Sequence, residues 1–333
     1  MYAIMGITGR VGGAIAENLL AQGEKIRAIV RNPEKAVRWR DRGAEIAVAD
    51  IDDPNSLACA FEGTDGVFLM VPPNFAPVPG FPEVRKTLAS YHAALAKALP
   101  RKVVYLSSIG AEQTSGLGLI TGSHLLEQTL GDLPFAHAFL RAGWFMENHA
   151  WDVTTAQSEG RICSNLYPLD RKFSLVATAD IGKVGADVLR QEWTGTRYIE
   201  VAGPEQYSPN DIARALSNAL GRTIEAVVVP REKWTEFFVG QGMPEGRTEP
   251  RAEMVDGFNS GWIHFGVPGT EHITGTTSLT SVIARLVADA SHGEKPFVDP
   301  TSRVGSPPFA SLKAETHGQA KELLDEAVRR NEM

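Results

Sequence analysis

The sequence predicts an α/β protein built on a doubly wound parallel sheet. Short apolar segments alternate with amphipathic helical segments along residues 2–141, which is the order of repeated strand–helix–strand units. The apolar segments do not alternate with polar residues, as expected for parallel strands covered by helices on both faces. A glycine-rich turn follows the first of them. Ligands of such sheets bind at the carboxyl ends of the strands, so a binding site is expected there.

The composition is that of a globular protein with room for one large domain and a smaller lobe. The chain has 333 residues, of which 43% are hydrophobic and 22% are charged. Its formal net charge of -7 argues against direct nucleic-acid binding, which depends on Lys and Arg neutralising phosphates. The two cysteines, Cys59 and Cys163, lack metal-ligand spacing, so no metal site is predicted. No charged leader and no apolar segment of about eighteen residues is found, which predicts a cytoplasmic protein without a membrane anchor.

A turn of the form Gly-x-x-Gly-x-x-Gly joins a strand over residues 2–5 to a helix that begins near Val11. Gly6 permits the tight turn, Gly9 lets the backbone approach a pyrophosphate, and Gly12 lets the helix lie close to the strand. The N–H groups at the helix start are then free to hold phosphate. The residues predicted to contact a cofactor here are Gly6, Thr8, Gly9, Arg10, Val11 and Gly12.

The end of the second predicted strand, residues 25–31, indicates which cofactor is bound. An Asp or Glu at this point holds the ribose 2′-hydroxyl of NAD, whereas a cation accommodates the 2′-phosphate of NADP. The chain has Arg31 here, with Lys35 one helical turn further and Arg10 in the glycine turn. Three cations are therefore expected to converge on one phosphate, and NADP(H) is the predicted cofactor. The alternative is that Arg31 and Lys35 are solvated surface charges.

Two further segments are expected to wall the cofactor. Asp50 and Ile51 follow the third strand, where the carboxylate would accept the adenine amino group and Ile51 would pack on the ring. The alternative for Asp50 is an acid at a helix N-terminus. Val71 and Pro72 lie where the fourth strand leads into residues 72–80, which are rich in Pro and Gly. Because proline lacks an N–H donor, no regular structure is predicted there.

A helix over residues 83–99 and a strand over 102–108 continue the pattern, and the strand ends in two hydroxyls. Ser107 is expected to hydrogen-bond the nicotinamide or ribose, and Ser108 to reach the mouth of the cleft. The other predicted elements are helices over 33–42 and 54–61, a flexible loop over 110–122, a helix over 123–130, a strand over 135–141, a strand and turn over 198–204, a helix opened by Ser208 and Pro209 and ending at Leu220, and a strand over 224–229.

Several of these motifs occur together in a known family. They are Gly6-x-x-Gly9-x-x-Gly12, Arg31-Asn32-Pro33, Leu106-Ser107-Ser108, Glu127, the segment from Leu140 to Asn148, and Asp180-Ile181-Gly182. From Met1 to about Leu286 the chain resembles the NmrA-like group of atypical short-chain dehydrogenase/reductases. The resemblance implies a Rossmann domain, NADP(H) binding, and a smaller C-terminal α/β lobe that closes over the nicotinamide.

The expected domain organisation follows from these segments. Residues 1–150 are expected to form the NADP-binding Rossmann domain, with returns from 174–202, and residues 151–290 to supply the substrate lobe. Residues 291–333 are expected to form a Pro- and Gly-rich linker and a C-terminal helix with a narrow apolar stripe. The stripe predicts packing on the chain itself, on a protein partner or in a homodimer. A mobile tail is the alternative.

The resemblance leaves the chemistry open, because the chain lacks the Tyr-x-x-x-Lys pair with which typical short-chain enzymes exchange a proton. Many relatives carry the Lys where this chain has Ser123, beside His124. One explanation is a reductase that delivers a hydride to a small electrophile such as a quinone, an enone or a similar activated carbonyl. Another is a catalytically silent redox sensor that binds NADP(H) and a protein partner. An epimerase or dehydratase is the weakest explanation, because it normally needs the missing pair.

Ser108 and His124 are the candidate catalytic residues of a reductase, because a hydroxyl or an imidazole suits the oxyanion that forms on the acceptor. A structural role is the alternative for each. Trp144, Phe145 and Asn148 follow the sixth strand, where a substrate pocket is expected. Core packing is the alternative for these three residues.

Overall fold

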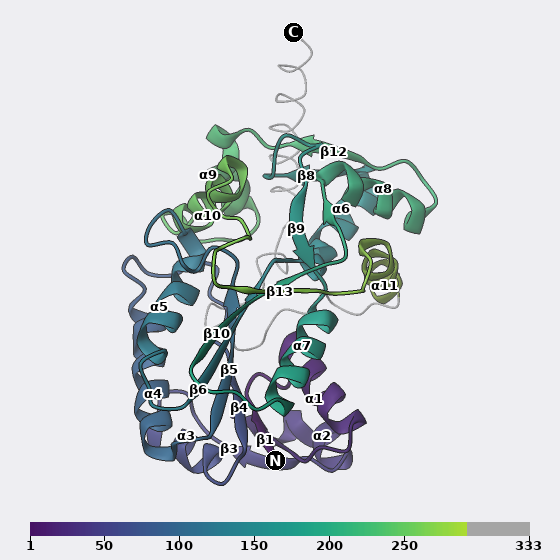
Figure 1. Ribbon diagram of the computed structural model, residues 1–333. Coiled ribbons are helices and arrows are strands. Elements are labelled where there is room, and N and C mark those ends of the chain that lie inside the picture. Colours follow the sequence, from purple (N-terminus) through teal and green to yellow (C-terminus); the bar gives the residue numbers. More distant parts are fainter. Residues whose placement is uncertain (292–333) are drawn as a thin grey trace.

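The computed structural model describes residues 1–291. Residues 292–333 lie outside the described residues, and with them the expected C-terminal helix and nearly all of the expected linker. Figure 1 shows a layered α/β body with a lobe at one end of its strands. Because the chain passes from β6 directly into β7 of the lobe, this is the end at which the strands have their carboxyl termini.

Eight parallel strands form the large sheet, in the order β13-β10-β6-β5-β4-β1-β2-β3, which confirms the predicted doubly wound fold. Their bounds are β1 (Tyr2–Ile4), β2 (Ile26–Val30), β3 (Glu45–Val48), β4 (Gly66–Leu69), β5 (Lys102–Ser108), β6 (Ala136–Ala142), β10 (Thr196–Ala202) and β13 (Glu271–Thr274). Strands β1 and β4 pair directly although β2 and β3 separate them in sequence, so the strand order reverses between them. In sheets of this type a ligand crevice opens at that reversal.

Helices cover both faces of the sheet (Figure 1). One face carries α1 (Arg10–Ala21), α2 (Val37–Asp41) and α7 (Thr178–Arg190), and the other carries α3 (Pro54–Phe61), α4 (Pro82–Ala98) and α5 (Thr121–Leu130). Strand residues such as Ala3, Phe68 and Val104 are 0% exposed between these layers. Burial on both sides explains why the apolar segments of the sequence do not alternate. The helix expected over 33–42 differs slightly, since it begins as a 3-10 turn, η1 (Pro33–Ala36).

The contact between α1 and α7 depends on two glycines of α7. A Cβ at Gly182 would lie 2.3 Å from the Cβ of Ala14, and one at Gly185 would lie 2.9 Å from Cδ1 of Ile15. Only hydrogen at these positions lets two close-packed helices approach this far. Gly182 of the Asp180-Ile181-Gly182 motif therefore serves the packing of α7 on α1, whereas Asp180 accepts the N–H and the hydroxyl of Thr277.

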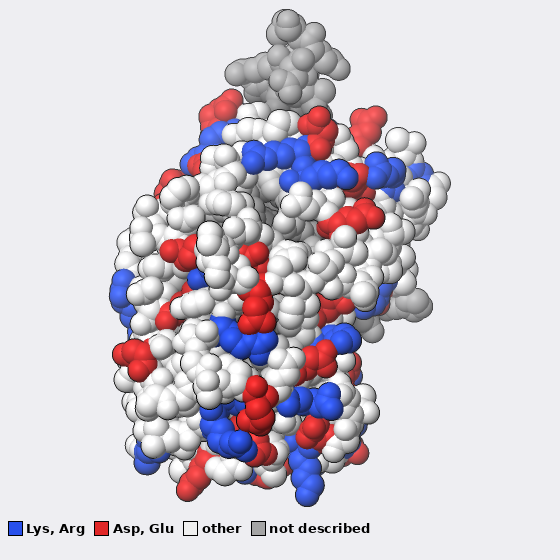
Figure 2. Space-filling view, in the orientation of Figure 1, with Lys and Arg blue, Asp and Glu red and all other residues white. Residues whose placement is uncertain are grey.

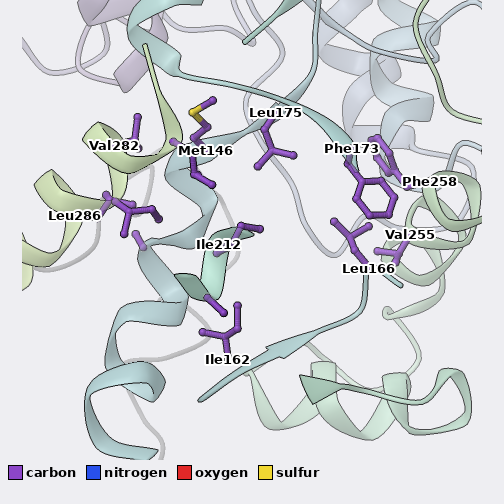
Figure 3. Packing of buried hydrophobic residues seen from close by; sticks show 14 of the residues in the cluster. Met146, Ile162, Leu166, Phe173, Leu175, Ile212, Val255, Phe258, Val282 and Leu286 are labelled. Atoms are coloured by element: carbon purple, nitrogen blue, oxygen red, sulfur yellow. The ribbon is translucent and has the colours of Figure 1, made fainter. Parts of the chain in front are cut away.

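The lobe consists of shorter elements. Its sheets are β11-β9-β7, made of β7 (Trp144–Phe145), β9 (Phe173–Val176) and β11 (Gln206–Tyr207), and β12-β8, made of β8 (Arg161–Ser164) and β12 (Glu225–Val228). Its helices are η3 (Met146–Trp151), α6 (Asp152–Glu159), α8 (Pro209–Leu220), η4 (Arg231–Lys233), α9 (Trp234–Gly240), α10 (Glu249–Ser260) and α11 (Leu279–Ser291). Figure 3 shows how side chains from these segments, such as Met146, Ile212 and Val282, meet in one core.

The segment over 110–122, expected to be a flexible loop, is held in place and is partly helical at η2 (Gly118–Ile120). The N–H of Gly118 donates to Oε2 of Glu253 at 3.1 Å, and Nε1 of Trp262 donates to the carbonyl oxygen of Ser115 at 2.9 Å. These partners lie 135 and 147 residues away in the sequence. The local sequence gave no sign of these two partners.

Charges of both signs are interspersed on the face drawn in Figure 2. Some form bridges between elements. Arg197 of β10 donates from Nε and Nη2 to the two carboxylate oxygens of Glu271 in β13, at 2.7 Å each. This two-point contact joins the outermost strand of the sheet to its neighbour.

Candidate functional site

A cavity of about 370 Å³ opens at the carboxyl ends of β1, β2 and β4, beside the reversal in strand order. The lining residues that the sequence predicted as cofactor contacts are Gly6, Thr8, Gly9, Arg31, Lys35, Ile51 and Pro72. The other lining residues are Met5, Ile29, Val30, Asn32, Ala49, Met70 and Tyr91. The glycine turn and the end of the second strand, predicted separately, thus face one space.

Gly6 and Gly12 are required as glycines by the geometry of the turn. Gly6 has φ of +64°, and a Cβ there would lie 2.7 Å from Sδ of Met70. A Cβ on Gly12 would lie 2.4 Å from the carbonyl oxygen of Gly6 and 2.7 Å from that of Met5. Side chains avoid both conditions, the first because of backbone strain and the second because of overlap. The start of α1 therefore lies directly against the end of β1, as the spacing predicted.

The N-terminus of α1 is available to an anion. Gly9 is the N-cap residue, lines the cavity and provides no capping side chain. The first N–H groups of a helix lack partners within the helix, and the helix dipole favours negative charge beside them. Val11 lies behind this surface, since it is 4% exposed and packs in the core between the sheet and its helices.

Two of the three expected cations meet at the cavity. Arg31 and Lys35 both line it, and Asn32 between them caps η1 by accepting the N–H of Glu34 at 2.9 Å. Arg10 is not among the lining residues. Its Nη1 donates to the main-chain oxygen of Glu147 at 3.0 Å, and burial lowers the pKa of its guanidinium. Arg10 thus joins the turn to the lobe, and its predicted contact with the 2′-phosphate stays a prediction.

Asp50 and Ile51 separate at the end of β3. Ile51 lines the cavity, whereas Asp50 is exposed outside the lining. The Oδ1 of Asp50 accepts the N–H of Asp52 at 3.0 Å, which closes a turn ahead of α3. Val71 is likewise outside the lining, next to Pro72, which is part of it.

Ser107 belongs to a buried polar network. Its hydroxyl donates to Oε1 of Glu127 at 2.6 Å, and Glu127 binds Arg141 through two hydrogen bonds of 3.0 Å and 2.7 Å. Although burial opposes the charge of Arg141, Glu127 and Glu112 raise the pKa of its guanidinium. Because the proton of Ser107 is already given to Glu127, the hydroxyl can serve a cofactor only as an acceptor.

His124 and Ser108 are connected by one turn, outside the lining of the cavity. The carbonyl oxygen of Ser108 accepts the N–H of Ala111 at 3.1 Å, and the carbonyl oxygen of Ala111 lies 2.9 Å from Nδ1 of His124. Since a carbonyl only accepts, Nδ1 must carry the hydrogen, and Nε2 is the nitrogen left for proton exchange. Both side chains are partly exposed.

Trp144, Phe145 and Asn148 are all partly exposed, but they lie in different surroundings. The Trp144 ring meets Phe258 of α10 edge-on, with ring centroids 5.3 Å apart, and its Nε1 is buried without a hydrogen-bond partner in residues 1–291. Phe145 packs instead against the core between the sheet and α1. Asn148 lies in η3, the segment that follows them.

The buried carboxylate of Glu147 was not predicted from the sequence to have a structural role. It accepts the N–H of Thr178 at the start of α7 at 3.0 and 3.1 Å and the hydroxyl of Thr178 at 2.7 Å. Nη2 of Arg285 in α11 lies 3.3 Å away. Glu147 therefore anchors a helix N-terminus, where a negative charge is favourable. Its only sequence signal was its place in the segment from Leu140 to Asn148.

Tyr91 was expected to be a core residue of α4, and it is fully buried from solvent. Its hydroxyl also donates to the carbonyl oxygen of Met70 at 3.1 Å, and it borders the cavity. Burial raises the pKa of the phenol above its ordinary value, so Tyr91 stays neutral and shapes the cavity floor.

In the described part of the chain, no group of three or more His, Cys, Asp or Glu side chains is arranged to hold a metal ion. No helix within residues 1–291 is both long enough and apolar enough to span a bilayer.

Comparison with known proteins identifies a family. The NmrA-like family matches residues 2–262. Among curated proteins, the NAD(P)H azoreductase of Xenophilus azovorans is 27% identical over 254 residues, which cover 76% of this chain and 86% of that protein. Quinone oxidoreductase 2 of Escherichia coli (strain K12) is 25% identical over 292 residues, which cover 86% and 98%.

Solved structures show the same fold. The NADPH complex of the NADPH-dependent quinone oxidoreductase QOR2 from Escherichia coli matches with a TM-score of 0.73 and 24% identity, over 86% of this chain and 99% of that one. The NADP(H) complex of the Citrobacter sp. triphenylmethane reductase matches with a TM-score of 0.72 and 22% identity, over the same shares.

Proposed function

The chain belongs to the NmrA-like family, and on this premise we propose that it is an NADP(H)-dependent reductase that transfers a hydride to a quinone, an enone or a similar activated carbonyl. The observation that carries the proposal is the cavity at the strand reversal, where the glycine turn faces Arg31 and Lys35. The azoreductase and quinone oxidoreductase relatives support a reductase.

Each side of the cavity suits one part of the cofactor. The uncapped N-terminus of α1 suits the pyrophosphate, and Arg31 with Lys35 suits the 2′-phosphate. Ile51 and Pro72 offer apolar surface to the adenine ring. The bound cofactor would supply the hydride, and the protein would supply position and electrostatics.

The acceptor is proposed to bind near Ser108, His124 and Asn148. An electron-poor acceptor forms a stabilised oxyanion, so a protonated Nε2 of His124 or a water molecule suffices as the proton donor. This chemistry does not require the Tyr-x-x-x-Lys pair that the sequence lacks. The Ser108 hydroxyl can donate a hydrogen bond to the same oxyanion.

The alternative is a catalytically silent redox sensor that binds NADP(H) and a protein partner. The missing pair favours it, as does the engagement of Ser107 with Glu127. Turnover decides between the two. The absorbance of NADPH is followed with a panel of quinones, enones and azo compounds. Oxidation of NADPH with at least one acceptor is the expected result. Cofactor binding without turnover on any acceptor would favour the sensor.

A further inference from the structure

Arg251 lies in the first turn of α10, on the face that points into the lobe. Val255, one helical turn further on, and Phe258 pack in the lobe core near Leu166 and Phe173 (Figure 3). Side chains four residues apart share one face of a helix. Arg251 thus extends inward with them, at the edge of this core.

The partners of the Arg251 guanidinium are all neutral. Its carbon lies 4.3 Å from the centre of the Phe238 ring, in a cation–π contact. Nη1 donates to Oε1 of Gln241 at 3.0 Å and lies 3.8 Å from Sδ of Met243. Arg251 has no ion pair within residues 1–291. Its Nε and Nη2 donors are therefore left without a protein acceptor in that part of the chain.

Arg251 is nevertheless charged at neutral pH. Burial lowers the pKa of its guanidinium to about 10, and the charge of Asp152 only partly opposes this shift. The carboxylate of Asp152 is itself bound by Nδ1 of His149 at 2.7 Å. The Arg251 side chain is partly exposed, and its Nε and Nη2 are not among the fully buried atoms without a partner, so a ligand can reach them from solvent. A desolvated cation without a counter-ion is unfavourable unless a ligand completes it.

Arg231 shows what a structural arginine looks like in the same lobe. Its guanidinium also lies over an aromatic ring, 4.8 Å from the centre of Trp234. Its Nε, however, donates to Asp256 at 2.8 Å, and its Nη2 lies 3.6 Å from Glu249. Arg251 stacks on an aromatic ring as Arg231 does, but no carboxylate within residues 1–291 pairs with its guanidinium.

Arg251 is linked to the elements that carry the proposed acceptor site. Asp152, whose charge acts on Arg251, directly follows η3, and η3 carries Asn148. Trp144, also expected in the substrate pocket, contacts Phe258 on the same helix as Arg251. An acceptor lying against η3 and Trp144 would have its far end within the part of the lobe that α10 covers.

We propose that Arg251 binds a carboxylate group on the acceptor, so that the enzyme selects anionic aromatic acceptors over neutral ones. This inference rests on the proposed function, because only a reductase has an acceptor. The binding site itself can be tested without turnover. Stacking on Phe238 fixes the plane of the guanidinium, and its free donors match the two oxygens of a carboxylate. The carboxylate would supply the counter-ion that residues 1–291 do not provide.

Calorimetric titration of the full chain with 2-naphthoate and with uncharged 2-naphthamide tests the site directly. The wild type should bind naphthoate at least about tenfold more tightly than the amide, as expected for charge-assisted hydrogen bonds. Arg251→Met should abolish that difference, and the matched control Arg231→Met should retain it. Equal binding of the two probes by the wild type, or an unchanged preference in Arg251→Met, would overturn the proposal.

Stability separates a ligand-binding from a structural role. Arg251→Met should melt at or above the wild-type temperature, because it removes a buried charge without a partner. A large loss of stability would show a structural arginine and would overturn the proposal. Arg251→Lys, as a second variant, keeps the positive charge but not the planar pair of donors and should lose most of the preference for naphthoate. Full retention in the Lys variant would contradict the bidentate contact.

A turnover experiment distinguishes failure of this inference from failure of the proposed function. The acceptors are a 1,4-naphthoquinone with a propionate side chain and its methyl ester, which share one reacting ring. Arg251→Met should raise KM for the acid about tenfold or more at similar kcat and leave the ester unchanged. Equal rates for both acceptors in both proteins would overturn the inference and keep the reductase. Naphthoate binding that depends on Arg251, without turnover of either quinone, would keep the site and reject the reductase.

Discussion

Arg10 of the glycine turn donates a hydrogen bond from Nη1 to the main-chain oxygen of Glu147, 3.0 Å away in η3. The carboxylate of Glu147 caps α7 through Thr178 and faces Arg285 of α11. A single residue of η3 thus connects the cofactor turn, a helix of the Rossmann layers and a helix of the lobe. Position in the turn had suggested a phosphate ligand, and the contact instead suggests a link between the layers.

Arg10→Met separates these two roles. If Arg10 positions η3, the variant should keep its preference for NADPH over NADH, while KM for the acceptor rises several-fold because Asn148 lies in the same segment. Titration with both cofactors and steady-state kinetics provide the measurements. A loss of the NADPH preference would show instead that Arg10 binds the 2′-phosphate.

Arg31→Asp should reverse the cofactor preference. The substitution removes a donor to the 2′-phosphate and introduces the acid that holds a 2′-hydroxyl, so NADPH binding should weaken roughly tenfold to hundredfold. Calorimetry with NADPH and NADH measures both affinities. Arg38→Asp is the control, because Arg38 pairs with Glu17 outside the cavity. Equal NADPH affinity in wild type and Arg31→Asp would refute the assignment.

Gly12→Ala should cost stability and cofactor affinity together. The new Cβ would lie 2.4 Å from the carbonyl oxygen of Gly6, and a forced overlap of this kind typically costs about 1–3 kcal/mol. Urea unfolding and NADPH titration measure the two effects. Gly23→Ala is the control: with φ of +76° and no atom within 4 Å, it introduces backbone strain without overlap. Unaltered NADPH binding in a folded Gly12→Ala protein would argue against the turn as the phosphate site.

His124→Asn tests the proton donor. An Asn side chain can still donate to the carbonyl oxygen of Ala111, as Nδ1 does, but it lacks the proton-exchanging Nε2. We expect kcat for a carbonyl acceptor to fall about hundredfold while NADPH affinity stays unchanged. Ser108→Ala provides the comparison at the other end of the same turn. If neither variant slows turnover, water is the proton donor.

Asp211 should make stability depend on pH in a predictable direction. Burial alone would raise its pKa, but hydrogen bonds from the N–H and hydroxyl of Ser208 and from Arg214 lower it. A carboxyl with a lowered folded pKa contributes stability above its unfolded pKa of about 3.9. That contribution is lost as the pH falls through the folded value.

Asp211→Asn removes this contribution and weakens the capping box of α8. The variant should be less stable by about 1 kcal/mol at neutral pH, and the difference should shrink as the pH falls through the lowered folded pKa of Asp211. Urea unfolding at several pH values measures it. Asp187→Asn, which loses an exposed pair with Lys183, should change stability little at any pH. A difference that persists in acid would show that the cap acts without its charge.

The sequence predicted the Rossmann layers well because their signals are local. The inner strands β1, β4 and β6 are runs of buried residues, the turn repeats glycine at a fixed spacing, and Ser208 precedes Pro209 and Asp211 in a complete capping box. Seven of the cofactor contacts proposed from such signals line the cavity.

Contacts that depend on distant partners were not predictable in this way. Arg10 meets Glu147 across 137 residues, and the hydroxyl of Ser107 is taken by Glu127 of another element. The lobe strands β7, β8, β9 and β11 are only two to four residues long, too short to show a period, whereas β12 lies within the strand predicted over 224–229. For Tyr91, helical spacing correctly indicated burial, but it could not show that the phenol borders a cavity.

The late position of β10 and β13 has a consequence for how the protein is made. These strands complete the sheet beyond β6, yet β7, β8 and β9 of the lobe precede β10, and the lobe segments from β11 to α10 lie between β10 and β13. During synthesis β6 therefore keeps an unpaired backbone edge until Thr196–Ala202 has left the ribosome, and such edges invite pairing with other chains. A gene fragment that ends after the first six strands would express that open edge permanently. The sheet and the lobe therefore have to be synthesised together for the sheet to be completed.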